Sequence, residues 1–165
     1  FLKRPKKFSE DKSNIKSTIF HYLSCCKQVD RPDIIVLLQP TSPLREKNLI
    51  DIGLSKLISS KKSTALIELC PIKLFYGKIS KGYWKSVNKE GARKQDISPI
   101  FIPSGRLFIY KVDDHFFKNK KKNISYIIQN HQMNVNIDTP GDVDRLHNIY
   151  KLNSKKYKFI EDYNL

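Results

Sequence analysis

An unbroken apolar run, Ile34 to Leu38, is the feature that most constrains the fold of this chain. Its residues are β-branched or leucine, which is typical of a strand buried on both faces of a parallel sheet. The run leads directly into the segment QPTSPLR at 39–45. Ligands of open α/β sheets bind at the carboxyl ends of strands, and prolines stiffen a loop. The pattern therefore predicts a rigid ligand-binding loop, although an ordinary strand-to-helix connection would use the same turn residues.

The rest of the chain predicts helices and strands that alternate around this strand. Apolar residues recur at helical spacing from about residue 12 to 28, with Ser9 or Asp11 as the N-cap, and again over 49–58. Further strands are expected at 63–69, 107–110 and 124–128, and Thr139 with Pro140 predicts a last helix to about Leu152. We expect one α/β domain over residues 1–152, with a mainly parallel, Rossmann-like sheet and a peripheral tail at 153–165.

Residues 71–95 interrupt this alternation. Short aromatic pieces are separated here by Gly77, Gly82 and Gly91, which is typical of an antiparallel arm or hairpin. Such an arm cannot bury both faces of its own aromatic side chains. Packing on its own domain and packing on a partner subunit both fit the pattern, and the second would make the protein a homodimer.

The net charge of +15 raises nucleic acid as a partner. The lysines are scattered, however, and the densest cluster, at 118–122, is typical of a solvated face, so nucleic acid is disfavoured. No apolar run approaches the roughly 20 residues of a membrane span. Cys25, Cys26 and Cys70 give neither metal-ligand spacing nor an even disulfide set. We expect a soluble protein of the reducing cytoplasm.

Four blocks of the sequence, in this order, resemble one enzyme family. They are Arg4-Pro5 with Ser9, Asp11 and Ser13, LLQPTSPLR at 37–45, RKQDISPIFIPSGRLFIY at 93–110, and NIDTPGDVDRL at 136–146. Together they resemble the acylneuraminate cytidylyltransferases, or CMP-sialic acid synthetases, and their relatives for pseudaminic and legionaminic acids. The resemblance implies a nucleotide-diphospho-sugar transferase-like α/β fold and Mg²⁺. It also implies transfer of CMP from CTP to a nonulosonic (sialic-type) acid, with release of pyrophosphate.

The resemblance also implies site residues. They are Arg4, Ser13, Gln39, Thr41, Ser42, Gln95 and Gly105 for nucleotide and substrate binding, Arg93 and Lys94 for catalysis, and Asp138 and Asn136 for magnesium. Several have a plain structural alternative. Arg4 could be a surface arginine, Ser13 a helix-start serine and Asp138 an N-cap. Arg45, beside the set, is expected to cap the next helix or to pair on the surface.

Ile15 stands at a position where the family has a hydroxyl, and three further residues depart from the family pattern. Lys94 stands where arginine commonly precedes Gln-Asp, so either Arg93 takes over the carboxylate or the lysine acts as a weaker point charge. Asn136 replaces an aspartate, which removes a negative charge from the expected metal site. Arg106 replaces a small residue, and we expect it to alter the acceptor pocket.

The first block that resembles the family, at Arg4-Pro5, corresponds to a part of the family pattern that follows its opening segment. Family members open with a strand and a glycine-rich, basic loop that cradles the triphosphate, and this sequence holds no such stretch. We therefore expect the chain alone to turn over poorly or not at all. The alternatives are a degenerate remnant of the family and a non-catalytic basic binding module.

Overall fold

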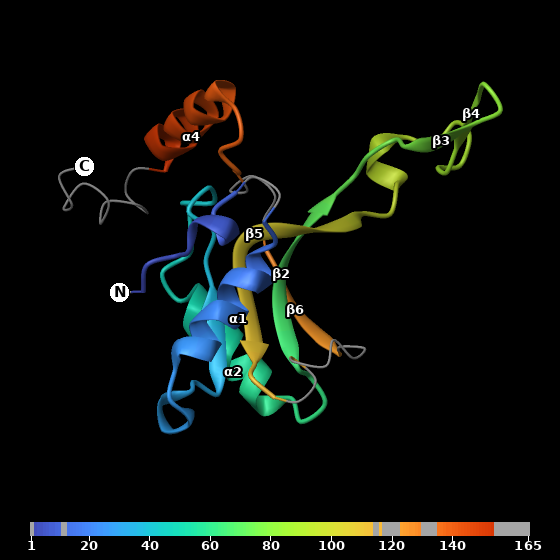
Figure 1. Ribbon diagram of the computed structural model, residues 1–165. Helices are drawn as coiled ribbons and strands as arrows, with labels where there is room; N and C mark the ends of the chain where they lie inside the picture. The colour runs from blue at the N-terminus through green and yellow to red at the C-terminus, as the bar shows by residue number, and fades with distance from the viewer. Residues whose placement is uncertain (1, 11–12, 114–115, 117–122, 130–134, 154–165) are drawn as a thin grey trace. The chain divides into compact units, whose positions relative to one another are not determined.

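The computed structural model describes residues 2–10, 13–113, 116, 123–129 and 135–153 (Figure 1). Asp11, the lysine cluster at 118–122 and the tail beyond Asn153 lie outside these residues. The contacts of the backbone divide the chain into two compact units, Phe1–Ile34 and Ile35–Leu165. None of the helices in the described part is long and apolar enough to cross a membrane.

The first unit is helical. A 3₁₀ turn, η1, spans Lys6–Phe8, helix α1 spans Ile15–Cys25, and a second 3₁₀ turn, η2, spans Gln28–Asp30. Asn14 is the N-cap of α1, because its side chain accepts a hydrogen bond from the Lys16 amide at 2.9 Å. The helix predicted for this region is therefore confirmed over Ile15–Cys25, but its cap is neither Ser9 nor Asp11.

The second unit is built on a sheet with the strand order β1-β5-β2-β6. These strands span Ile34–Leu37, Ile100–Lys111, Ala65–Ile72 and Ile124–Ile128, respectively. Each strand that the sequence predicted is present, and β5 is longer than expected because it begins at Ile100. The fold is therefore a mixed α/β fold.

The sheet is mixed rather than mainly parallel, which corrects the expectation from the sequence. Strand β2 pairs with β6 in parallel but with β5 antiparallel. Strands β2 and β5 are antiparallel because of the connection between them. After β2 the chain enters the arm and returns as β5 without a crossover helix. A strand that returns directly to its neighbour runs antiparallel, because parallel neighbours need a long crossover. The helix–strand alternation before the arm gave no information on the direction in which β5 returns.

Helix α2, Leu49–Ser59, packs on the sheet through a close contact at Gly53. A Cβ atom added to Gly53 would lie 2.8 Å from Cδ1 of Ile109 and 2.9 Å from Cδ2 of Leu107. Leu49 and Leu57 of the same helix are fully buried. Each buried leucine contributes about 1.5–3 kcal/mol relative to an exposed one, so this contact supplies much of the core.

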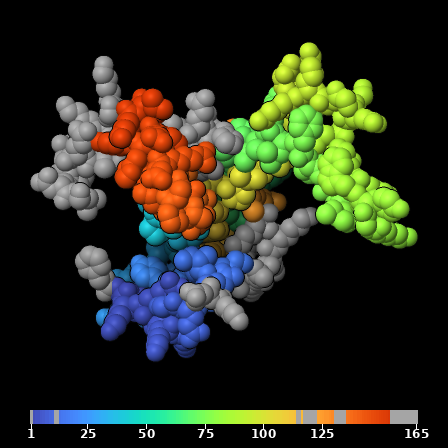
Figure 2. Space-filling view, turned by 90° about the horizontal axis from the view of Figure 1, so that it is seen from above, coloured from blue at the N-terminus to red at the C-terminus, as the bar shows by residue number. Residues whose placement is uncertain are grey.

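The arm is confirmed as an antiparallel hairpin of β3, Gly77–Ser80, and β4, Tyr83–Ser86. Lys81 and Gly82 form its turn with φ of 53° and 80°, as a type I′ hairpin turn requires. The aromatic side chains Tyr83 and Trp84 are 75% and 61% exposed. Figure 2 shows the arm as the yellow-green surface of the molecule.

The last described helix, α4, spans Pro140–Leu152 and confirms the helix predicted there. Thr139 is its N-cap, and Asp142 completes a capping box with it. Leu146, Ile149 and Tyr150 of this helix pack on Leu44, which is buried. Helix α4 is therefore anchored to the loop that follows β1.

Candidate functional site

Polar side chains from two other segments of the chain converge on Gly105. Its φ is +81°, a left-handed conformation that glycine adopts without strain. A Cβ atom added there would lie 2.6 Å from Oε1 of Gln39, 2.7 Å from Oγ of Ser42 and 3.0 Å from Oδ1 of Asn136. We call Gln39, Ser42, Gly105 and Asn136 the polar cluster. All four were predicted from the sequence as site residues, and the structure brings them together.

Hydrogen bonds join the loop of residues 39–45 to the segment that contains Asn136. The Ser42 hydroxyl, which is fully buried, donates to Oδ1 of Asn136 at 2.5 Å. The Ile137 amide donates to the carbonyl of Thr41 at 2.8 Å, while the Thr41 side chain is exposed. The Ser42 hydroxyl therefore binds a distant segment rather than its own loop. The loop of residues 39–45 is held against the segment that precedes α4.

The Arg45 side chain links the two ends of this loop and connects it to β5. Its Nη2 donates to the carbonyl of Gln39 at 2.6 Å, and its Nε donates to the carbonyl of Arg106 at 3.0 Å. Burial, and after it the charge of Arg106, lowers the pKa of Arg45, while Glu68 acts in the opposite direction. The expectation of a helix cap or a surface pair is wrong here, because both hydrogen bonds go to main-chain carbonyls around the polar cluster.

Arg106 lies in the interior, not in an open pocket. It is 1% exposed, and it binds the fully buried Glu68 through two parallel contacts, Nη2 to Oε1 at 2.6 Å and Nε to Oε2 at 2.9 Å. The Ser104 hydroxyl also donates to Oε2 of Glu68, and Nη1 of Arg106 donates to the carbonyl of Leu44 at 3.1 Å. The side chain thus supports the loop from the core, and its effect on the acceptor pocket stays a prediction.

Sequence reasoning missed Glu68 entirely, although a signal was present. Glu68 is the one charged residue in the strand segment ALIELC at 65–70, whose other residues are all apolar. A charged side chain in a strand buried on both faces requires a partner of opposite charge. Arg106, in the core strand expected around 107–110, is the basic residue available as this partner, but the family pattern alone relates it to the acceptor pocket.

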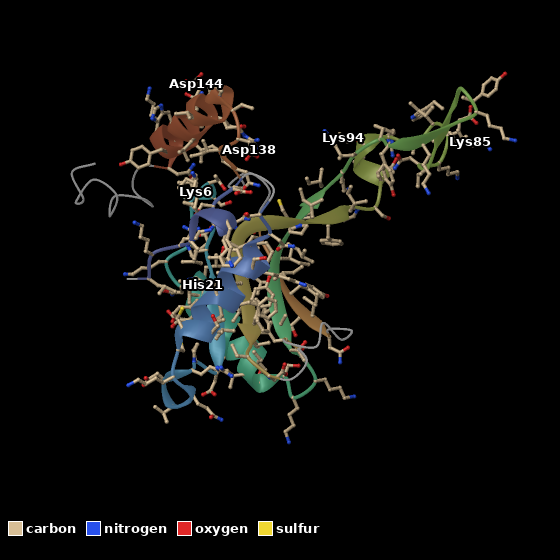
Figure 3. All side chains as sticks on the ribbon, in the orientation of Figure 1. Lys6, His21, Lys85, Lys94, Asp138 and Asp144 are labelled. Atoms are coloured by element: carbon tan, nitrogen blue, oxygen red, sulfur yellow. The ribbon has the colours of Figure 1, made fainter. Side chains whose placement is uncertain are left out.

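The 3₁₀ turn η3, Lys94–Asp96, contains Lys94 and Gln95, and Arg93 directly precedes it. Figure 3 labels Lys94. All three are exposed. Nε of Arg93 pairs with Oδ2 of Asp96 at 2.8 Å, and the Gln95 carbonyl accepts a hydrogen bond from Nζ of Lys73 at 2.5 Å. No hydrogen bond within the described residues links these three side chains to the polar cluster, so the structure does not add them to it.

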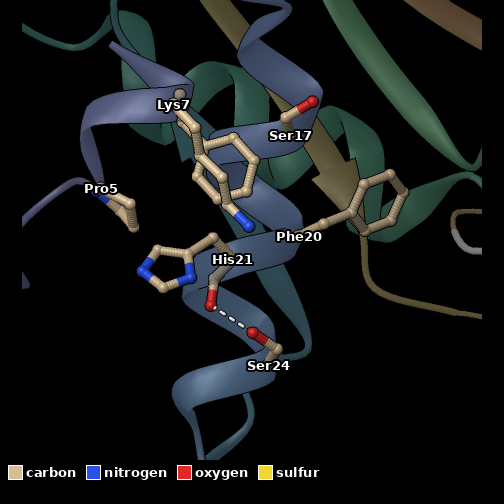
Figure 4. Close-up of a pocket in the computed structure, with 7 residues that line it drawn as sticks. Pro5, Lys7, Ser17, Phe20, His21 and Ser24 are labelled. Carbon is tan, nitrogen blue, oxygen red and sulfur yellow. Dashed lines mark hydrogen bonds between the residues drawn. The ribbon is translucent and has the colours of Figure 1, made fainter.

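Arg4 and Ser13 belong to the first unit. Arg4 is exposed, and the Ser13 hydroxyl donates to the carbonyl of Lys7 at 3.0 Å. This unit also contains an open hollow of about 660 Å³, shown in Figure 4. It is lined by Pro5, Lys7, Phe8, Ser17, Phe20, His21 and Ser24, none of which the sequence had marked as a site residue.

The two residues predicted for magnesium differ in their surroundings. Asp138 is exposed just before α4 (Figure 3). It is not the N-cap, because Thr139 takes that place and Asp142 accepts from the amides of Asp138 and Thr139 at 3.2 Å and 2.8 Å. Asn136 is half-buried, and its Oδ1 already accepts from Ser42. The hydroxyl of Thr139, which donates to Asp142 at 2.8 Å, and after it the amides of Thr139 and Asp138 lower the pKa of Asp142.

This donor set can serve magnesium only together with other oxygens. Magnesium at nucleotide sites is commonly held by one or two carboxylates, with phosphates and waters as the remaining ligands. Asp138 offers a carboxylate and Asn136 a neutral amide oxygen. In the described ranges, no group of three or more His, Cys, Asp or Glu residues could hold a metal ion. The residues therefore fit a magnesium ion that arrives with a nucleotide better than a dedicated protein cage.

Neither a family model nor a curated protein sequence matches this chain. Among solved structures, it is similar to the 4-diphosphocytidyl-2C-methyl-D-erythritol synthase of Anaerococcus prevotii, with a TM-score of 0.54 and 12% identity. The match covers 81% of this chain and 64% of that one. At this identity the likeness shows the fold alone. The chain shares the α/β fold of that synthase and spans about 64% of the length of the synthase.

Proposed function

We propose that this chain belongs to a cytidylyltransferase that transfers CMP from CTP to a nonulosonic, sialic-type acid and releases pyrophosphate. The observation that carries the proposal is the polar cluster. Its four residues come from three of the sequence blocks that resemble the acylneuraminate cytidylyltransferases, and they meet around Gly105. The fold of a 4-diphosphocytidyl synthase supports cytidylyl transfer in general. The choice of acceptor rests on the sequence resemblance.

The proposed reaction needs positioning and neutralisation of charge more than covalent help from the protein. The anomeric hydroxyl of the sugar attacks the α-phosphorus of CTP, and the bond to the pyrophosphate oxygen breaks. The Gln39 amide can donate to and accept from the polar groups of the sugar or nucleotide. Arg93 and Lys94 would meet the carboxylate of the acceptor. Asp138 and Asn136 would hold Mg²⁺, which supplies positive charge opposite the phosphates.

The cradle for the triphosphate is the part that we propose must be supplied from elsewhere. Helix N-termini and successive backbone amides usually receive such phosphates, and the sequence lacks the family's glycine-rich basic loop. Strand β1 is at the end of the sheet order, and its four apolar residues, Ile34–Leu37, are all half-buried. Both observations support the addition of a strand and phosphate loop at this edge.

We also propose that the protein is a cytoplasmic homodimer that uses the arm. Support comes from its exposed aromatic side chains, with Phe75 at 56%, Tyr83 at 75% and Trp84 at 61%. Covering them on a second subunit would remove apolar surface from water, worth about 25 cal/mol for each Å². Cys25, Cys26 and Cys70 form no disulfide in the described part of the chain, which fits a reducing compartment.

Calorimetric titration separates the proposal from a basic binding module. The chain is titrated with CTP and Mg²⁺ and, separately, with a short RNA at two salt concentrations. We expect saturable binding of CTP and little RNA binding. RNA binding that weakens steeply with salt, without a response to CTP, would identify the basic module instead.

Release of pyrophosphate tests the reaction itself. CTP is incubated with N-acetylneuraminate or a related nonulosonate and two proteins: the chain as given, and a version with a family-type amino-terminal strand and loop. We expect turnover only from the extended version. Full activity of the unextended chain would overturn the proposal that the cradle must be supplied, and an inactive extended version would count against cytidylyl transfer.

A further inference from the structure

We propose that the buried Glu68–Arg106 pair is a positioning device that sets the geometry of the polar cluster, and that its removal loosens the cluster without unfolding the sheet. Its consequence for nucleotide binding rests on the function proposed above. Neither residue would touch a substrate, because both are almost completely buried, with exposures of 0% and 1%. Their influence must pass through the groups that they hold.

Every polar side-chain atom of the pair has at least one hydrogen-bond partner. The guanidinium of Arg106 uses two nitrogens for the Glu68 carboxylate and a third for the carbonyl of Leu44. The carboxylate accepts in addition from the Ser104 hydroxyl. Buried ion pairs often stabilise a protein no more than a well-packed apolar pair would. Stability alone therefore does not account for this pair, whereas its bond to the loop carbonyl has a direct geometric effect.

Contacts run from the pair to both ends of the loop. At one end, Arg106 donates from Nη1 to the carbonyl of Leu44 at 3.1 Å. At the other, the Arg106 carbonyl accepts from Nε of Arg45 at 3.0 Å, and Nη2 of Arg45 donates to the carbonyl of Gln39 at 2.6 Å. Gly105, the centre of the polar cluster, directly precedes Arg106. Fixing Arg106 thus fixes Gln39 and Gly105 relative to each other.

The planar fork of arginine is necessary for this arrangement. Lysine carries the same charge as one rotatable ammonium group and cannot hold a carboxylate at two points while also reaching the Leu44 carbonyl in a fixed direction. Arg106→Lys should therefore keep a buried charge pair but lose the fixed orientation of the loop. Replacing both residues by methionine removes both charges together, so no unpaired buried charge remains.

Amide hydrogen exchange tests the positioning role without any substrate. The amides of Ser42 and Ile137 report on the loop, since they donate to the carbonyls of Gln39 at 3.1 Å and Thr41 at 2.8 Å. The amides of Leu66 and Ile109, in β2 and β5, report on the core. In Glu68→Met/Arg106→Met we expect exchange at Ser42 and Ile137 to become about tenfold faster while the core amides change little. Lys56→Met, on the surface of α2, is the control and should change neither pair.

Two results of the exchange experiment would overturn the proposal. One is unchanged protection of Ser42 and Ile137 in a folded double variant. The other is an equal acceleration at all four amides, which would mean that the pair only stabilises the fold. If the double variant fails to fold, Arg106→Lys replaces it, with the same expectation of a selective acceleration at the loop.

Calorimetry with CTP and Mg²⁺, in proteins that all carry the family-type amino-terminal strand and loop, tests the consequence for binding. We expect wild-type protein to bind and the double variant to bind about tenfold more weakly, with Lys56→Met unchanged. Equal affinity of wild type and double variant would overturn the link between the pair and the nucleotide. Absence of CTP binding by wild type would instead count against the proposed function, while the exchange result would still decide whether the pair positions the loop.

Discussion

At the scale of single residues, the polar cluster shows how much depends on one position without a side chain. Gly105 lets Gln39, Ser42 and Asn136 approach the same point, and its positive φ favours glycine over residues with a side chain. The sequence identified all four positions through motif resemblance. It could not predict that Ser42 would bind Asn136, because these residues are far apart in the chain and their contact depends on the sheet.

Gly105→Ala should be the most damaging small substitution in this part of the protein. Alanine would have to adopt the left-handed backbone conformation of Gly105. Its methyl group would also lie 2.6 Å from Oε1 of Gln39 and 2.7 Å from Oγ of Ser42. We expect a loss of about 2–3 kcal/mol in the free energy of unfolding, measured by urea denaturation. Gly82→Ala is the matched control, since it has a φ of +80° and no atom within 4 Å of the added Cβ. It should cost only about 1 kcal/mol, and equal losses for both variants would mean that crowding at Gly105 has no effect.

Asn136→Asp should maintain or raise activity at limiting Mg²⁺. A carboxylate can accept the same hydrogen bond from Ser42 that the amide oxygen accepts now, and it adds the negative charge that magnesium favours. The measurement is pyrophosphate release against Mg²⁺ concentration, in the version that carries the amino-terminal segment. Asp138→Ala, which removes the carboxylate proposed to hold Mg²⁺, should abolish turnover in the same assay. An active Asp138→Ala variant would show that this carboxylate is not a metal ligand.

At the scale of elements, local signals in the sequence predicted local structure well. The helix at Pro140–Leu152 has a Thr-Pro start, and the hairpin at 77–86 has turn glycines, so both could be predicted from a few adjacent residues. The direction of β5 could not, because it depends on the path of the chain between β2 and β5 and not on the residues of β5 itself. The same limit explains why the Glu68–Arg106 pair was missed, as it joins two strands whose pairing had not been predicted.

The capping box of α4 should make the stability of this helix dependent on pH. Hydrogen bonds from Thr139 and the Asp138 amide lower the pKa of Asp142 in the folded protein. A carboxyl group with a lowered pKa contributes stability above its ordinary unfolded value, and this contribution is lost as the pH falls toward the folded value. Thermal denaturation of wild type and Asp142→Asn between about pH 7 and about pH 3 measures it. We expect the difference in Tm to be largest near neutrality and to shrink in acid; a constant difference would contradict the assignment.

At the scale of the whole molecule, the proposed assembly depends on the arm. Size-exclusion chromatography with light scattering should give a dimer for wild type and a monomer for Tyr83→Ser/Trp84→Ser, because these side chains are 75% and 61% exposed. Tyr126→Ser is the control, as Tyr126 is 50% exposed on β6, outside the arm. A wild type that remains monomeric at high concentration, or a double variant that remains a dimer, would rule out this use of the arm.

The arm also gives the protein an intrinsic optical label. Trp84 is the single tryptophan of the chain, and its indole is held in a surface hairpin rather than in the sheet core. Fluorescence excited at tryptophan wavelengths should therefore respond to whatever covers the arm, with a shift of emission to the blue as water leaves the ring. The same signal should change little when the core around Leu66 and Ile109 melts, so unfolding has to be followed by circular dichroism. Emission spectra recorded over a dilution series would thus report association directly, without any attached dye.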